Sequence, residues 1–170
     1  MFQKLITVLI VPLVFALGAW AQNPSPHQHA AADVIDGSVH PELIPDAVAW
    51  RLYLLAVSEN PSPLPNESRR QHAHLQKAGL GEQDINATAP ILANFKTAYA
   101  TMIDSYNHSP EVLNNTNDGL PLFLAKRDAL VQATRDALKA TLTPKGMSNL
   151  QAQIQKEKAT MRVAAKEAQQ

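Results

Sequence analysis

The chain has 170 residues, of which 15 are Lys or Arg and 15 are Asp or Glu, and it contains no cysteine. The lack of cysteine excludes disulfides, thiol catalysis and thiolate metal sites. Residues 22–119 carry 5 basic and 11 acidic side chains, whereas residues 120–170 carry 9 basic and 4 acidic ones. We therefore expect oppositely charged helices to pack together. Because no tight Lys/Arg cluster occurs, we expect no nucleic-acid partner.

The first 21 residues have the pattern of a secretory signal peptide. Lys4 gives a basic start, Leu5–Ala19 is an apolar run, and Ala19-Trp20-Ala21 supplies the small residues that a signal peptidase recognises. The run is shorter than the roughly 20 residues that span a bilayer, so we prefer cleavage near Ala21 and leave an uncleaved anchor as the alternative. The sequence therefore predicts an exported, periplasmic or extracellular protein without stable membrane insertion after cleavage.

The mature chain is predicted to hold one folded domain. Residues 22–40 begin with Pro, Gln, Ser and His and offer little to bury, which predicts a flexible linker. Residues 41–168 form a helical bundle domain, and their number suits a single core.

A nearly all-apolar helix is predicted over about 46–58. Pro41 and Pro45 stand before it, where proline fits a first helical turn, and Asp46 suits the positive end of the helix dipole. Arg51 is its one clear polar exception. Because a helix that is apolar on every side is surrounded by others, Arg51 must reach the surface or meet a carboxylate. Arg51 is thus the one candidate for a buried polar or ligand-binding site.

Helical periodicity and helix-ending residues predict the remaining elements. A short polar helix near 66–78 ends at Gly79, and a long helix near 82–107 contains Pro90. Its apolar stripe has heptad-like spacing and consists of Thr88, Leu92, Phe95, Tyr99, Met102 and Tyr106. Long helices near 120–142 and 144–166 follow, and Thr143 caps the second of them.

The fold class that these elements predict is all-α. No segment alternates with a two-residue period, so no sheet is expected. The four main helices form an antiparallel bundle, because the short turn between the last two forces them to run in opposite directions. The helix over 46–58 is its central element.

The sequence offers little catalytic or metal-binding chemistry. On a helix, His72 and His74 diverge by about 200°, so they cannot hold one ion together. The pair His27/His29 has no fixed third ligand. No glycine-rich phosphate loop or catalytic Ser, His and Asp motif stands out. We therefore predict no metal, no cofactor and no catalytic residue, and we favour a protein that is not an enzyme.

Two further patterns have an ordinary structural interpretation. The tetrapeptide Arg-Asp-Ala-Leu occurs at 127–130 and again at 135–138, which predicts a helix with its charged residues outward. Trp50, the three tyrosines and the methionines are expected in the core or in an apolar groove. A groove that contains methionine can accept varied partners.

Both ends of the helical region resemble a set of uncharacterised exported bacterial helical proteins. The first end carries Asp-Gly-Ser at 36–38, then Pro-Glu-Leu-Ile-Pro-Asp at 41–46 and Ala49. The second end is Leu-Thr-Pro-Lys-Gly and the helix that follows, residues 142–161. The Leu-Thr-Pro start is also similar to periplasmic chaperone-like proteins with an LT-x-x-Q motif, but Gly146 replaces the glutamine. The resemblance implies export and an all-helical domain.

Three hypotheses of function remain from the sequence. The first is a non-enzymatic bundle that binds another envelope protein or unfolded client proteins, in a chaperone-like way. The second is a helical bundle that binds a small ligand or acts as an enzyme, with its site near Arg51. The third is a structural or anchored envelope protein that an uncleaved signal segment holds at the membrane.

Overall fold

A computed structural model describes residues 34–58, 67–114 and 118–168. The predicted signal peptide (1–21), the first twelve residues of the predicted linker and the pair His27/His29 lie outside these ranges. The described elements are almost all helical, so the predicted all-α bundle is confirmed.

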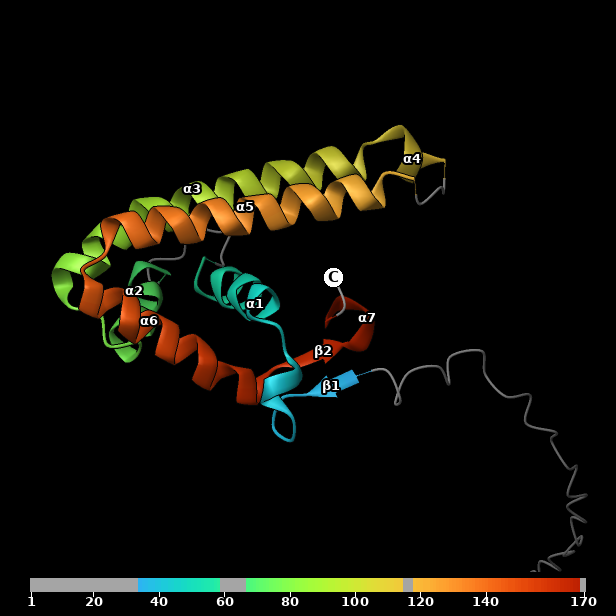
Figure 1. Ribbon diagram of the computed structural model, residues 1–170. Helices are drawn as coiled ribbons and strands as arrows, with labels where there is room; N and C mark the ends of the chain where they lie inside the picture. Colours follow the sequence, from blue (N-terminus) through green and yellow to red (C-terminus); the bar gives the residue numbers. More distant parts are fainter. Residues whose placement is uncertain (1–33, 59–66, 115–117, 169–170) are drawn as a thin grey trace, which may run out of the picture. The chain divides into compact units, whose positions relative to one another are not determined.

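The longest elements are helices α3 (Glu82–Asn107) and α5 (Leu120–Thr141). Figure 1 shows them side by side, with the short helix α4 (Pro110–Leu113) at the end where they are joined. Pro90 lies inside α3, as predicted. The stripe that contains Leu92 and Phe95 is buried, and these two side chains are each 2% exposed.

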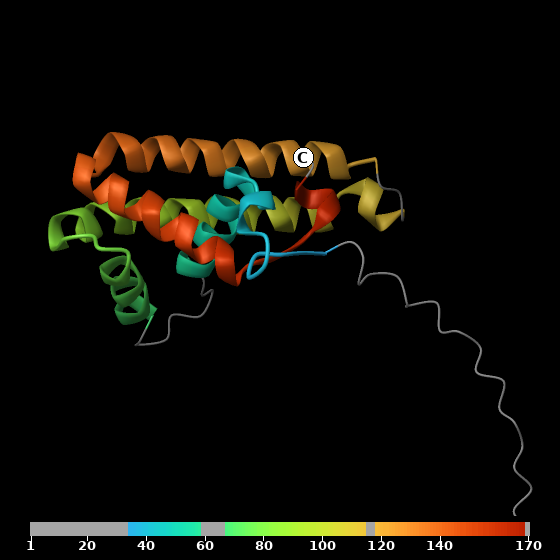
Figure 2. The same cartoon turned by 60° about the horizontal axis from the view of Figure 1, so that its bottom comes forward.

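Helix α1 (Asp46–Ser58) is the central element. It packs against α3, α5 and α6 (Pro144–Glu157), and in Figure 2 it lies between α6 and the pair α3 and α5. Eight of its thirteen residues are buried, which confirms the prediction of a helix enclosed by others. Its apolar burial stabilises the fold, since apolar area removed from water contributes about 25 cal/mol per Å².

A hydrogen-bonded network joins the start of α3 to the start of α6. The buried carboxylate of Asp84 accepts from the backbone N–H of Thr143 at 2.9 Å and from its hydroxyl at 2.7 Å. The Thr143 hydroxyl oxygen accepts in turn from the N–H of Gly146 at 3.0 Å. Thr143 therefore caps α6, as predicted, and Asp84 holds the cap in place.

The last helix ends earlier than predicted. Helix α6 stops at Glu157 and is followed by the 3-10 helix η2 (Lys158–Thr160), strand β2 (Arg162–Ala164) and helix α7 (Ala165–Ala168). Met161, between η2 and β2, has an extended backbone with φ −85° and ψ 146°. The predicted helix over 144–166 was wrong beyond residue 157, because strand pairing competes with the helix there.

A short sheet contradicts the prediction that the chain has none. Strand β1 (Val34–Asp36) pairs with β2 in antiparallel register, with Ile35 opposite Val163. Strand β1 also lies within residues 22–40, which the sequence assigned to a linker. Three-residue strands show no periodicity, and their hydrogen bonds go to a segment more than 120 residues away, so the sequence pattern cannot reveal them.

The remaining elements are short. The 3-10 helix η1 (Pro41–Leu43) leads into α1, and α2 (Glu67–Lys77) is the predicted polar helix. Gly79 ends α2 with a φ of +78°, a conformation that glycine adopts without strain. Among the described residues, no helix combines the length and the apolar character that a membrane crossing needs.

An ion pair between an exposed carboxylate and a buried lysine connects the first turn of α1 to η2. Lys158 is 7% exposed, and its Nζ donates to Oδ1 of Asp46 at 2.6 Å. Gln155 donates to the same oxygen at 2.8 Å. These bonds, first from Lys158 and then from Gln155, lower the pKa of the Asp46 carboxyl.

We expect Asp46→Asn to lower the free energy of unfolding at pH 7 by about 1–2 kcal/mol, because it leaves a buried ammonium without a counter-charge while the exposed carboxylate limits the effect. Since the folded-state pKa of Asp46 is depressed, its contribution is full above the unfolded pKa of about 3.9 and is lost as the pH falls through the folded value. Urea unfolding at pH 7, 5 and 3 should therefore show variant and wild type converging at low pH. Asp118→Asn, at an exposed position, is the control and should change little.

Candidate functional site

The candidate site lies where α3 ends and α5 begins. Helix α3 ends at Asn107, and Ser109 then caps α4 by accepting from the N–H of Val112 at 3.4 Å. Pro110 fits the first turn of α4, where no amide hydrogen is needed. The rings of Tyr106 and Phe123 lie 4.5 Å apart between centroids and join the two long helices at this end.

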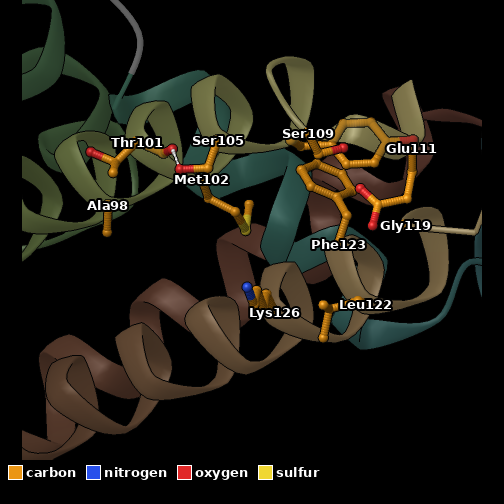
Figure 3. Close-up of a pocket in the computed structure, with 11 residues that line it drawn as sticks. Ala98, Thr101, Met102, Ser105, Ser109, Glu111, Gly119, Leu122, Phe123 and Lys126 are labelled. Carbon is orange, nitrogen blue, oxygen red and sulfur yellow. Dashed lines mark hydrogen bonds between the residues drawn. The ribbon is translucent and has the colours of Figure 1, made fainter. Parts of the chain in front are cut away.

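A cavity of about 430 Å³ opens beside this ring pair, and we call it the tip pocket. Its walls are mainly apolar and come from both long helices; they include Ala98, Met102, Tyr106, Leu122 and Phe123. Figure 3 shows the Met102 side chain of α3 and Lys126 of α5 pointing toward each other across the space between the helices. A volume of this size is at the small end of the range for ligand sites, roughly 300–1,000 Å³.

Three leucines of the elements that form the tip pocket are exposed, and one of them, Leu122, belongs to its wall. Leu113 at the end of α4 is 70% exposed, Leu122 in the first turn of α5 is 60% exposed, and Leu120 is 37% exposed. We call these leucines together with the tip pocket the tip surface. Large exposed apolar side chains that gather beside a cavity are typical of an interaction site.

The charged groups of the tip pocket are few. Lys126 is exposed, and no carboxylate in the described part of the chain pairs with it. Glu111 also lines the pocket and makes a polar contact of its own within the chain. The Ser105 hydroxyl donates to the carbonyl oxygen of Thr101 at 2.8 Å. The pocket thus offers one positive group, one negative group and the hydroxyls of Thr101, Ser105 and Ser109 on mainly apolar walls.

A second, smaller cavity of about 200 Å³ lies beside Tyr53 on α1 and His74 on α2. The Tyr53 hydroxyl is buried without a hydrogen-bond partner in the described part of the chain, and this burial raises its pKa. Glu157 lines the same cavity. Burial raises the pKa of Glu157, but bonds from Lys77 and Gln153 outweigh that effect and lower it.

Arg51, the candidate from the sequence, is 6% exposed in the middle of α1. It makes a contact within the chain and so does not extend into solvent. Neither the tip pocket nor the cavity beside Tyr53 is lined by Arg51. The structure therefore places this residue in the core and in the wall of neither cavity.

The two histidines of α2 face different neighbours, as the helical spacing predicts. His72 Nε2 lies 3.0 Å from Oε2 of Glu82, whereas His74 lines the cavity beside Tyr53. Within the described ranges, no group of three or more His, Cys, Asp or Glu side chains is placed to hold a metal ion.

The sequence predicted that the charged residues of the two Arg-Asp-Ala-Leu segments point outward, and the structure differs for both arginines. Arg127 is 7% exposed and donates from Nε to Oδ1 of Asp128 at 2.9 Å. Arg135 lies over the ring of Trp50, with its guanidinium carbon 5.0 Å from the ring centroid. Both arginines therefore belong to helix packing, Arg135 through a cation–π contact with the central helix.

Comparisons with protein-family models, with curated proteins and with solved structures found no match to this chain. The case for a function therefore rests on the chemistry of the tip surface. Sequence reasoning placed Met102 and Tyr106 on an apolar stripe and did not see that this stripe becomes accessible at its last turn. The sequence signal for this accessible surface was the pair of leucines on either side of Pro121, Leu120 and Leu122. Both are exposed in the structure.

Proposed function

We propose that this protein is an exported helical-bundle protein that binds another protein of the cell envelope through the tip surface. The observation that carries the proposal is an open apolar pocket with Leu122 exposed in its wall. Export is supported by the signal-peptide pattern at the start of the sequence.

The extent of the tip surface favours a protein segment over a small molecule. A small ligand would fill the pocket of about 430 Å³ and leave Leu113 and Leu120, which do not line it, in water. An amphipathic helix or an apolar strand can place one side chain in the pocket and cover the leucines as well. Met102 adds an adaptable wall, which suits partners of more than one shape.

The role of Leu122 can be tested with a photocrosslinking amino acid at this position in the exported protein in its own cells. We expect a repeatable protein adduct at position 122. The same amino acid at Leu43 is the matched control, since Leu43 is 54% exposed but belongs to η1. Equal adducts at both positions, or none at position 122 at good expression, would contradict the proposal.

The chemistry of the contact is tested by Leu122→Asp. A carboxylate that enters an apolar contact loses its hydration, which costs several kcal/mol, so binding of the identified partner should weaken more than about tenfold. Leu43→Asp should leave it unchanged. One repeatable partner would indicate a specific complex, and many unrelated unfolded proteins would indicate a chaperone-like role.

A further inference from the structure

The tip surface contains both halves of an interface. Leu122 is an exposed apolar side chain in the wall of the tip pocket, and the pocket itself is an apolar hollow. A surface that carries a projection and a hollow of the same chemistry can pair with its own copy, because in a two-fold contact each copy supplies both parts.

The charges on the tip surface have the same self-complementary character. In Figure 3 the ammonium of Lys126 and the carboxylate of Glu111 lie apart, with the Phe123 ring drawn between them. Lys126 has no ion-pair partner in the part of the chain that the structure describes. Glu111 already makes a contact, but a carboxylate offers about four lone-pair sites and can accept further bonds.

We propose that a second copy of this chain occupies the tip surface in a two-fold dimer, in which Lys126 of each copy faces Glu111 of the other. Leu122 of each copy then enters the tip pocket of its partner. The proposal rests on the proposed function, since it concerns the regulation of the same surface: the dimer covers the leucines until a partner protein displaces one copy. After cleavage near Ala21 the chain carries 14 basic and 15 acidic side chains, a formal net charge of −1, so two copies carry almost no overall repulsion.

The dimer is expected to be weak. Stable complexes bury about 800 Å² on each partner, which is more than a single pocket and its three flanking leucines provide. We therefore expect a dissociation constant of roughly 10–100 µM, which leaves the surface available to a partner that binds more tightly.

Charge reversal tests the pairing directly. Lys126→Glu and Glu111→Lys should each weaken the dimer at least about tenfold, because each variant places like charges opposite one another at both contacts. An equal mixture of the two variants should form a heterodimer with near wild-type affinity, since both of its contacts then join Glu to Lys. Sedimentation equilibrium on the exported chain measures the association of each variant alone and of their mixture. Lys139→Glu, exposed on the last turn of α5, is the control and should dimerise like wild type.

The outcomes separate this proposal from the proposed function. Circular dichroism first establishes that both variants are folded. A wild-type chain that stays monomeric up to about 1 mM overturns the dimer, as does a mixture of folded variants that fails to associate. Either result leaves a repeatable partner adduct at Leu122 intact. A wild-type dimer with heterodimer rescue but without any other protein adduct at Leu122 supports the dimer and overturns the proposed function.

Discussion

Replacing Gly146 with alanine should lower the free energy of unfolding by about 2–3 kcal/mol. In an ordinary helix the change would stabilise by up to about 1 kcal/mol, because alanine is the better helix former. Here a Cβ at Gly146 would overlap Oδ2 of Asp84. The Asp84 carboxylate cannot turn aside without losing its two hydrogen bonds to Thr143. Urea unfolding of both proteins measures the difference.

A double-mutant cycle shows whether Asp84 is the cause. In an Asp84→Ala background the space beside Gly146 is empty, so Gly146→Ala should become neutral or slightly stabilising. The same cost in both backgrounds would mean that the helix start, and not the contact with Asp84, rejects the methyl group. The contact with Asp84 also leaves no room at position 146 for the glutamine of the LT-x-x-Q motif.

Leu54→Ala should lower the free energy of unfolding by about 3–4 kcal/mol, the largest effect that we expect from a single truncation. Leu54 is fully buried in the middle of α1, which α3, α5 and α6 enclose. Loss of the side chain removes apolar contacts and leaves a cavity that three well-packed helices cannot close. Guanidinium unfolding monitored by circular dichroism gives the value.

Leu55→Ala is the matched control for Leu54. Leu55 is the next residue on the same helix and packs only partly buried against the core. Its truncation should cost about 1 kcal/mol, because water already reaches part of the side chain. Equal costs at the two positions would contradict this difference in burial and would mean that α1 is covered as fully at Leu55 as at Leu54.

The tip surface and the core follow the same apolar pattern but differ in what covers them. Phe95 and Tyr106 occupy one stripe of α3, and Phe95 is 2% exposed whereas Tyr106 lines an open pocket. The difference arises because α1 lies against the middle of the pair α3 and α5, whereas only the short helix α4 lies at the end where the two are joined. A surface of this kind is free to bind, and our two proposals use it.

Local sequence determined most of the helical elements. Apolar periodicity placed α3 and α5, and an apolar run behind two prolines placed α1. Gly79 ends α2 and Thr143 caps α6 at the predicted positions. The enclosed position of α1 also followed from its composition, since a helix without a polar face is stable in water only when others surround it. These features depend on residues within one or two helical turns of each other, so a sequence pattern can report them.

Only the tertiary structure decided the features that join distant residues. The end of α6 at Glu157 depends on β2 pairing with β1, and the hydrogen bonds of Asp84 go to Thr143, 59 positions away. The burial of Arg127 and the tip pocket likewise depend on which helices lie nearby. Periodicity tells which face of a helix is apolar, but whether that face is covered depends on the length and position of its neighbours. For this reason the sequence predicted an apolar stripe through Tyr106, and the structure showed that its last turn is an open surface.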